Sequence, residues 1–225
     1  MYNFISSTLF TVVANILAAF VLTVVILKYR KNKNELQIFL PYAVISVLQT
    51  LFTIIIVSYN PLNLDNTSFV EYFINLFTVL EILIFSFFFY SIFQSKFVRQ
   101  AIITVCGLFL LWFFYLWIYK GQMNIISDLP TVFETFFFIS LCLFYFYELF
   151  KHPPTVRLVQ SSTFWAVTGI FLLCSLLFPL FLFKDELLNV LPTIYLNFYA
   201  VNHIGYTVLF FCLIKATLCK VNPTS

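Results

Sequence analysis

The chain has 225 residues, of which 62% are hydrophobic and only 9% are charged, and its formal net charge is +3. A soluble globular domain carries about 25% charged residues, because its surface must face water. This composition therefore excludes a soluble protein and is typical of a chain whose sides face hydrocarbon. The net charge is too small to indicate nucleic acid binding.

Seven stretches of the chain meet the requirement of about 20 mostly apolar residues for crossing a bilayer. Helices are expected in all of them, because open sheet edges are not tolerated in lipid. The short spacers between them leave no room for a domain outside the membrane. We therefore predict one all-α integral membrane domain over residues 1–225, a seven-transmembrane helix bundle. Its spans are residues 4–27, 36–59, 70–93, 101–119, 131–150, 164–183 and 191–214.

The basic residues predict how these spans are oriented. The tail before the first span has no Lys or Arg, whereas a basic cluster at 28–33 follows it. Seven spans place ten of the twelve Lys and Arg residues on one side, leaving only Lys120 and Lys184 on the other. The positive-inside rule assigns the ten to the cytoplasm. We expect an outside N-terminus and a cytoplasmic C-terminus, in the cytoplasmic (inner) membrane of a bacterium.

The third and fifth spans each carry a glutamate, Glu81 near the middle and Glu134 within the first turns. An ionisable residue at bilayer depth is costly enough to be a functional hypothesis. Glu81 has two interpretations: a site for a ligand, proton or partner, or a protonated carboxyl bonded to a neighbouring helix. Glu134 is expected nearer the outer surface. Segments 78–81 and 131–134 both read Thr-Val-x-Glu, which hints at duplication, although chance in so biased a composition is the alternative.

The seventh span carries Asn202 and His203 at a depth comparable to that of Glu81. One interpretation pairs His203 with Glu81 across the bundle, because each group would offset the desolvation of the other. The other interpretation is a neutral imidazole bonded to Asn202, Asn197 or a backbone carbonyl. The sequence leaves both interpretations open.

Catalytic and metal-binding motifs are not found in the sequence. It holds two histidines and no HExxH, GxSxG or Walker A motif. Its five cysteines have no CxxC spacing, which predicts buried thiols behaving as small apolar residues. We therefore expect no enzyme activity, no catalytic residues, no metal and no cofactor.

The second half of the chain carries a recognisable aromatic pattern. Residues 145–151 read Tyr-Phe-Tyr-Glu-Leu-Phe-Lys, a loop with Pro153-Pro154 follows, and Phe164-Trp165 precedes Gly169. This pattern resembles that of small seven-helix membrane proteins of Bacteroidetes, in which a Phe-Trp pair opens the sixth span. The resemblance implies a seven-helix fold and a sensor module that acts with a histidine kinase. Independently, Trp165 is expected to anchor the cytoplasmic interface as an aromatic-belt residue.

Three functions fit these expectations. The first is a sensory or signalling membrane module that couples to a cytoplasmic or membrane protein partner, with loops 28–35 and 151–163 as candidate docking surfaces. The second is a structural subunit of a larger membrane protein complex. The third is a small carrier or channel that uses Glu81, Glu134 and His203. The expected partners are the lipid bilayer and another protein, without nucleic acid.

Overall fold

The computed structural model describes residues 2–28, 34–59, 65–120, 129–152, 158–183, 186 and 192–219, with side-chain surroundings for a smaller part of them. The regular structure in these ranges is helical, which confirms the predicted all-α class. Two 3-10 turns, η2 (Asn34–Ile38) and η4 (Leu158–Gln160), precede the second and sixth helices. The α-helices bounded within the described ranges are α1 (Tyr2–Lys28), α2 (Phe39–Tyr59), α3 (Asp65–Ile92), α4 (Lys96–Lys120), α5 (Leu129–Lys151), α6 (Ser162–Leu182) and α8 (Pro192–Leu218).

Each predicted apolar stretch coincides with one of these helices to within a few residues. Within the described residues, four helices are long and apolar enough to cross a membrane: Lys96–Leu116, Leu129–Lys151, Ser162–Leu182 and Val201–Leu218. Three further apolar helical segments are shorter, at Ile16–Leu27, Leu36–Leu48 and Leu76–Ile92. The chain therefore has the build of a helical membrane protein, and the count of seven spans stays a prediction.

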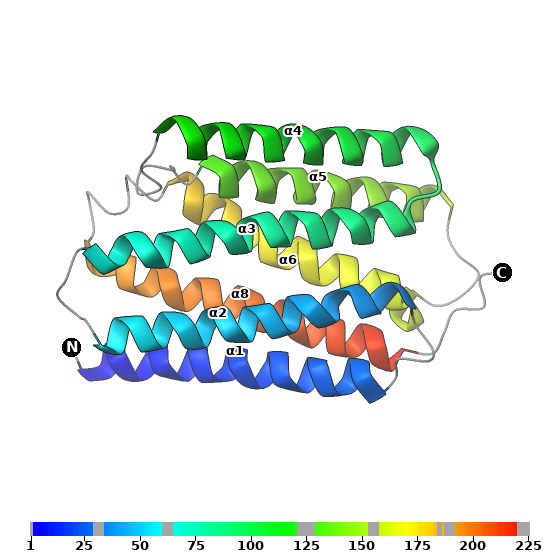
Figure 1. Ribbon diagram of the computed structural model, residues 1–225. Coiled ribbons are helices and arrows are strands. Elements are labelled where there is room, and N and C mark those ends of the chain that lie inside the picture. The colour runs from blue at the N-terminus through cyan, green and yellow to red at the C-terminus, as the bar shows by residue number, and fades with distance from the viewer. Residues whose placement is uncertain are drawn as a thin grey trace.

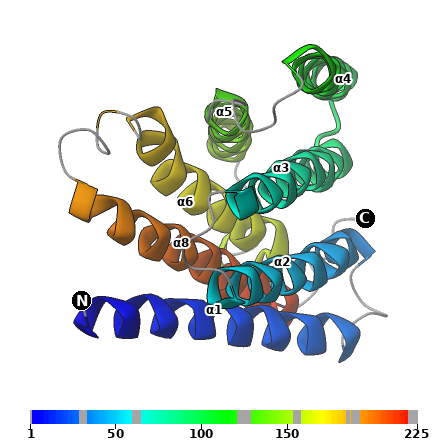
Figure 2. The same cartoon turned by 60° about the vertical axis from the view of Figure 1, so that its left-hand side comes forward.

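The helices run alternately in opposite directions, so α1 begins and α8 ends at opposite ends of the bundle (Figure 1). Six of them close into a ring in which α1 contacts α2 and α8, α3 contacts α2 and α5, and α6 contacts α5 and α8. The remaining helix, α4, packs on the outside of α3 (Figure 2). Side chains from all six helices of the ring fill its interior.

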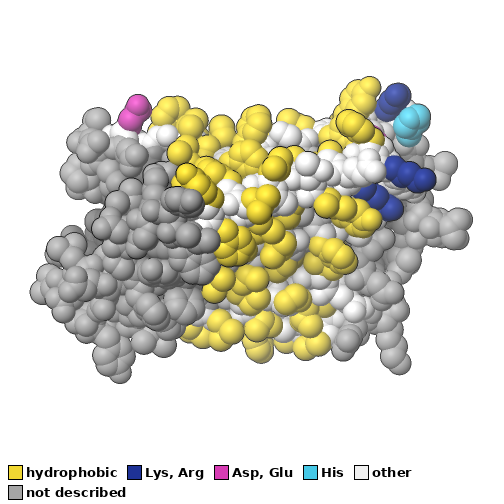
Figure 3. All heavy atoms as spheres, turned by 45° about the horizontal axis from the view of Figure 1, so that its top comes forward, with side chains coloured by type: hydrophobic (Ala, Val, Ile, Leu, Met, Phe, Trp, Pro, Cys, Tyr) yellow, Lys and Arg dark blue, Asp and Glu magenta, His cyan; other side chains and the backbone are white. Residues whose placement is uncertain are grey.

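The face of the bundle in Figure 3 is apolar around its middle, over the residues that the structure describes. An apolar surface of this extent suits contact with hydrocarbon rather than water. The described lysines and arginines lie instead at helix ends, with Lys96 and Arg99 in the first turn of α4 and Lys151 and Lys215 in the last turns of α5 and α8. The exposed apolar side chains include Phe20, Leu48, Phe87, Leu111, Phe136 and Phe211.

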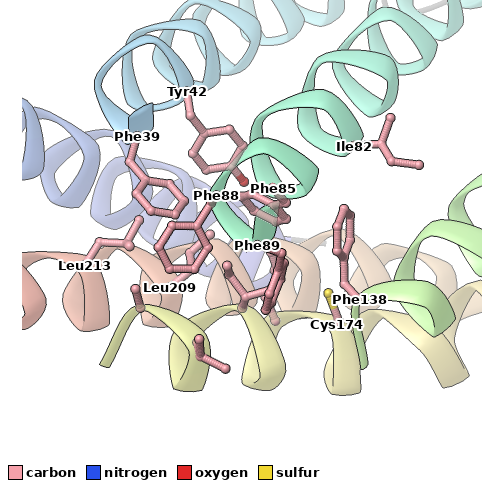
Figure 4. Close-up of a cluster of buried hydrophobic side chains, with 14 of the residues drawn as sticks. Phe39, Tyr42, Ile82, Phe85, Phe88, Phe89, Phe138, Cys174, Leu209 and Leu213 are labelled. Carbon is pink, nitrogen blue, oxygen red and sulfur yellow. The ribbon is translucent and has the colours of Figure 1, made fainter. Parts of the chain in front are cut away.

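Aromatic rings fill the interior, as the close-up in Figure 4 shows. Phe85 of α3 lies 5.2 Å from Phe138 of α5, and Phe88 of α3 lies 5.0 Å from Phe39 at the start of α2, measured between ring centres. Both pairs are tilted or edge-to-face, the arrangements that ring quadrupoles favour. Helices in lipid associate mainly through such packing. The buried face of α3 is thereby fixed against both neighbours.

Helices α6 and α8 approach each other closely at Gly169. A Cβ atom placed on Gly169 would lie 2.7 Å from Cβ of Cys212 on α8. Gly205 of α8 faces α6 in turn, and a Cβ there would lie 3.1 Å from the side chain of Leu173. Small residues allow transmembrane helices to pack backbone to backbone. The two glycines thus set the spacing at which α8 presents its other residues to the core.

Candidate functional site

Glu81 is the centre of a hydrogen-bonded link between three helices. It lies on the inner face of α3 and is only 6% exposed. The hydroxyl of Tyr42 on α2 donates to its Oε1 at 3.0 Å, and the hydroxyl of Tyr206 on α8 donates to its Oε2 at 3.2 Å. Each carboxyl oxygen therefore has a donor from a different helix, as a buried polar group requires.

Aromatic packing holds the two tyrosines in place. Phe77, one helical turn before Glu81, stacks on Tyr42 with ring centres 5.7 Å apart and meets Tyr206 edge-on at 6.0 Å. Phe85, one turn after Glu81, lies 5.2 Å from Tyr42. Residues four apart on a helix share a face. Phe77, Glu81 and Phe85 therefore all face the helices that carry the two tyrosines. The local sequence of α3 therefore builds the site.

Glu134 of α5 is a second buried carboxyl beside this link. It is 3% exposed. The contact between Phe85 and Phe138 places it near Glu81, because each ring lies four residues after one of the two glutamates and so shares its helix face. The expectation that Glu134 lies nearer the outer surface stays a prediction. The two Thr-Val-x-Glu segments lie on the contacting helices α3 and α5.

One oxygen of Glu134 is unusual. Its Oε1 is buried and has no hydrogen-bond partner within the part of the chain that the structure describes. A buried acceptor without a donor costs about 1–3 kcal/mol. Such an atom therefore requires an explanation, and a proton or a small cation would provide one. Cys174 of α6 is 3% exposed and belongs to the same buried core as Phe138 (Figure 4).

Metal chemistry finds little support at this site. Over the described ranges, no group of three or more His, Cys, Asp and Glu side chains is placed to hold a metal ion. Two carboxyls, two phenol hydroxyls and a thiol can hold a proton or a single small cation.

His203 and Asn202 lie on α8, about one turn before Tyr206. Both oxygens of Glu81 accept hydrogen bonds from tyrosine hydroxyls, and the donor from α8 is Tyr206. The predicted pairing of Glu81 with His203 stays a prediction. Oδ1 of Asn202 is buried and has no hydrogen-bond partner among the described residues, which keeps this residue a candidate for binding a polar group.

Trp165 lies in the first turn of α6, at the same end of the bundle as Lys151. Its indole Nε1 donates to the carbonyl of Val159 at 2.8 Å, and its ring meets Phe164 edge-on at 6.0 Å. Ser161 caps the helix by accepting from the backbone N–H of Phe164 at 3.3 Å. The indole therefore fastens the η4 turn to α6, and its role as an interface anchor stays a prediction.

The sequence did not identify Tyr42 or Tyr206 as site residues. The chain has 13 tyrosines, and a tyrosine in an apolar span carries no charge to mark it. A signal was available in retrospect, because a buried tyrosine needs a partner for its hydroxyl and Glu81 needs donors. Pairing the two required the helix contacts, which the sequence alone does not give.

Comparison with known proteins adds no family to this description. No protein-family model, no curated protein and no solved structure matches the chain. The resemblance to seven-helix membrane proteins of Bacteroidetes stays a prediction.

Proposed function

We propose that the chain is a seven-span protein of the bacterial cytoplasmic membrane that works as a sensory or signalling module. Its N-terminus lies outside and its C-terminus in the cytoplasm, where it couples to a protein partner. The Glu81 link between α2, α3 and α8 is its sensing element. The single observation that carries this proposal is the buried Glu81 carboxyl with donors from two other helices.

The distribution of charge supports the orientation. The described cations Lys96, Lys151 and Lys215 come from the start of α4 and the ends of α5 and α8, which meet at one end of the bundle (Figure 1). Glu186 follows the end of α6 and belongs to the opposite end. Cationic ends face the cytoplasm under the positive-inside rule. The three shorter apolar segments complete a count of seven spans when the whole helices are considered.

A column of aromatic rings supports coupling between Glu81 and the cationic end. Phe85, Phe89 and Phe93 follow Glu81 along the buried face of α3. Phe89 stacks on Phe93 with ring centres 6.0 Å apart. At the end of the column, Nε of Arg99 donates to the carbonyl of Phe93 at 2.6 Å. A movement of α3 at Glu81 would therefore displace the start of α4, where a cytoplasmic partner could detect it.

The same column weighs against a carrier that moves a substrate from Glu81 to the cytoplasm. Phe85, Phe88, Phe89 and Phe93 are each at most 2% exposed, so rings occupy the space that a pathway would need. Packed interiors switch between discrete arrangements more readily than they deform. A subunit of a larger complex remains the second candidate, favoured by the position of α4 on the outside of α3.

Copurification from native membranes tests the proposal against both alternatives. The wild type, Glu81→Gln and the control Glu148→Gln would be isolated in mild detergent, and bound proteins would be quantified. A sensor retains a stoichiometric partner whose activity changes with Glu81→Gln and not with Glu148→Gln. A structural subunit retains a partner that is indifferent to both changes. A chain without a partner that conducts protons in liposomes, and loses that flux with Glu81→Gln, would contradict the proposal.

A further inference from the structure

Glu81 and Glu134 are both buried, and each lies one turn before a ring of the contacting pair Phe85 and Phe138. Their carboxyl groups therefore share one buried region of the bundle, which contains no described lysine or arginine. The described cations Lys96, Arg99, Lys151 and Lys215 all lie at helix ends. Two like charges that share a site of low polarity cannot both be ionised without a large electrostatic cost. The site therefore requires something that removes one negative charge.

The hydrogen bonds of the two glutamates differ, and the difference shows which oxygen lacks a donor. Both oxygens of Glu81 accept from tyrosine hydroxyls, an arrangement that stabilises an ionised carboxylate. Oε1 of Glu134 is buried without a donor within the described part of the chain. A carboxyl oxygen that accepts no hydrogen bond is suited to be the protonated oxygen of that carboxyl. Each oxygen of Glu81 retains a second lone pair that can accept a further hydrogen bond.

The close packing at this site favours a proton over a larger occupant. Glu81 and Glu134 are followed one turn later by Phe85 and Phe138, whose ring centres are 5.2 Å apart, and Phe77 closes the other side against Tyr42. A proton needs no coordination space. A sodium ion or an organic cation would need several oxygen ligands or a cavity of its own size.

Other titratable groups approach the pair from each neighbouring helix. Tyr42 contacts Glu81 from α2 and Tyr206 contacts it from α8, and Cys174 of α6 lies in the same buried core. Cys142 lies on α5 itself, Cys106 lies on α4, and His203 precedes Tyr206 on α8. The described core residues of α1 are apolar and add no ionisable group: Ala18, Ala19, Leu22 and Ile26. Apart from His203, these neighbours are neutral near pH 7 at their ordinary values.

We propose that Glu134 holds a bound proton and donates it in a hydrogen bond to the Glu81 carboxylate, so that the two residues form a proton-binding site. The inference rests on the proposed function in one respect, because it identifies a proton as the ligand that the Glu81 sensing element binds. Release of this proton places two negative charges side by side, and their repulsion separates α3 from α5. The stimulus of the module is then the proton activity that this buried site experiences.

Infrared difference spectroscopy of the purified chain in lipid nanodiscs tests the site without any partner. A glutamic acid carbonyl gives a band that shifts in deuterium oxide, and an exposed carboxyl, ionising near a pKa of about 4.3, gives none at pH 7. The expected result is one protonated carboxyl per chain at pH 7, lost in Glu134→Gln. The band should persist at a changed frequency in Glu81→Gln and unchanged in Glu148→Gln.

Absence of the band in the wild type at pH 7 would overturn the inference, as would a band that survives Glu134→Gln. A band that appears only after sodium is removed would show that a metal cation occupies the site instead. If Glu134→Gln does not fold, Glu134→Asp keeps the acid and should shift the frequency, and an unshifted band would likewise overturn the assignment. A confirmed band in a chain that binds no partner would leave the proton site intact and contradict only the signalling function.

Discussion

The hydroxyl of Tyr206 lies 3.2 Å from Oε2 of Glu81, across 125 positions of the sequence. This contact ties the last helix to the third, and the matching contact of Tyr42 with Oε1 at 3.0 Å ties in the second. Loss of a donor to a buried carboxyl destabilises the fold by the full desolvation penalty of an unsatisfied polar group. The arrangement of α2, α3 and α8 therefore depends on the chemical state of one side chain.

Removing the tyrosine hydroxyls should destabilise the bundle. Tyr42→Phe and Tyr206→Phe each keep the ring and delete one donor to Glu81, so we expect a loss of about 1–3 kcal/mol each in the free energy of unfolding. Reversible unfolding in detergent micelles would measure it. Tyr147→Phe is the matched control, because Tyr147 is 60% exposed, and it should change stability little.

A double-mutant cycle separates this effect from general packing. In a Glu81→Gln background, each Tyr→Phe change should cost clearly less than it does in the wild type, because the charged acceptor is gone. Equal losses of stability in both backgrounds would show that the hydroxyls stabilise the fold through groups other than Glu81.

Adding a methyl group at Gly169 should disrupt the contact between α6 and α8. The new Cβ would lie 2.7 Å from Cβ of Cys212, closer than carbon atoms approach. Thermal unfolding should show a loss of stability for Gly169→Ala and none for Gly107→Ala, where nothing lies within 4 Å. Gly169→Ala combined with Cys212→Gly removes the clash and should recover part of the loss. A Gly169→Ala variant as stable as the wild type would contradict the close approach.

The contact between Phe85 and Phe138 should contribute strongly to stability. Phe138 is fully buried, so Phe138→Ala should cost about 3–5 kcal/mol through lost contacts and a cavity. Phe136, two residues earlier on α5, is 58% exposed on the outer face, and Phe136→Ala should cost far less. Comparable losses for the two variants, measured by unfolding in the same detergent, would show that the outer face of α5 is also packed against protein.

The orientation can be tested with a membrane-impermeant thiol reagent. Gln94 follows α3 at the cationic end, and Glu186 follows α6 at the other. In cells, a cysteine at Glu186→Cys should react from outside, and a cysteine at Gln94→Cys should react only after the membrane is opened. The reverse pattern would contradict the proposed orientation.

The fold was predictable because a helix that crosses lipid needs a long apolar run and little else. The seven runs in the sequence coincide with seven helices, from α1 at Tyr2–Lys28 to α8 at Pro192–Leu218. Helix contacts were not predictable in the same way. Gly169 and Gly205 lie on different helices, so a search for paired glycines within one helix does not find the interface that they form.

The site was predictable only in its charged members. Glu81 and Glu134 are conspicuous in apolar spans, whereas Tyr42 and Tyr206 look like ordinary aromatic residues until the helices are assembled. The nearness of the two glutamates was not predictable, because it depends on the packing of Phe138 on Phe85, one turn after each of them.

The central claim is that the state of Glu81 determines the arrangement of the cationic end of the bundle. Distance measurement between spin labels at Gln94 and Gln160, both exposed at that end, tests it most directly in lipid nanodiscs. The account predicts that Glu81→Gln shifts the mean distance by about 1–2 Å, the scale of helix displacements in switching proteins, while Glu148→Gln leaves it unchanged. Identical distance distributions for the wild type and Glu81→Gln would contradict the account.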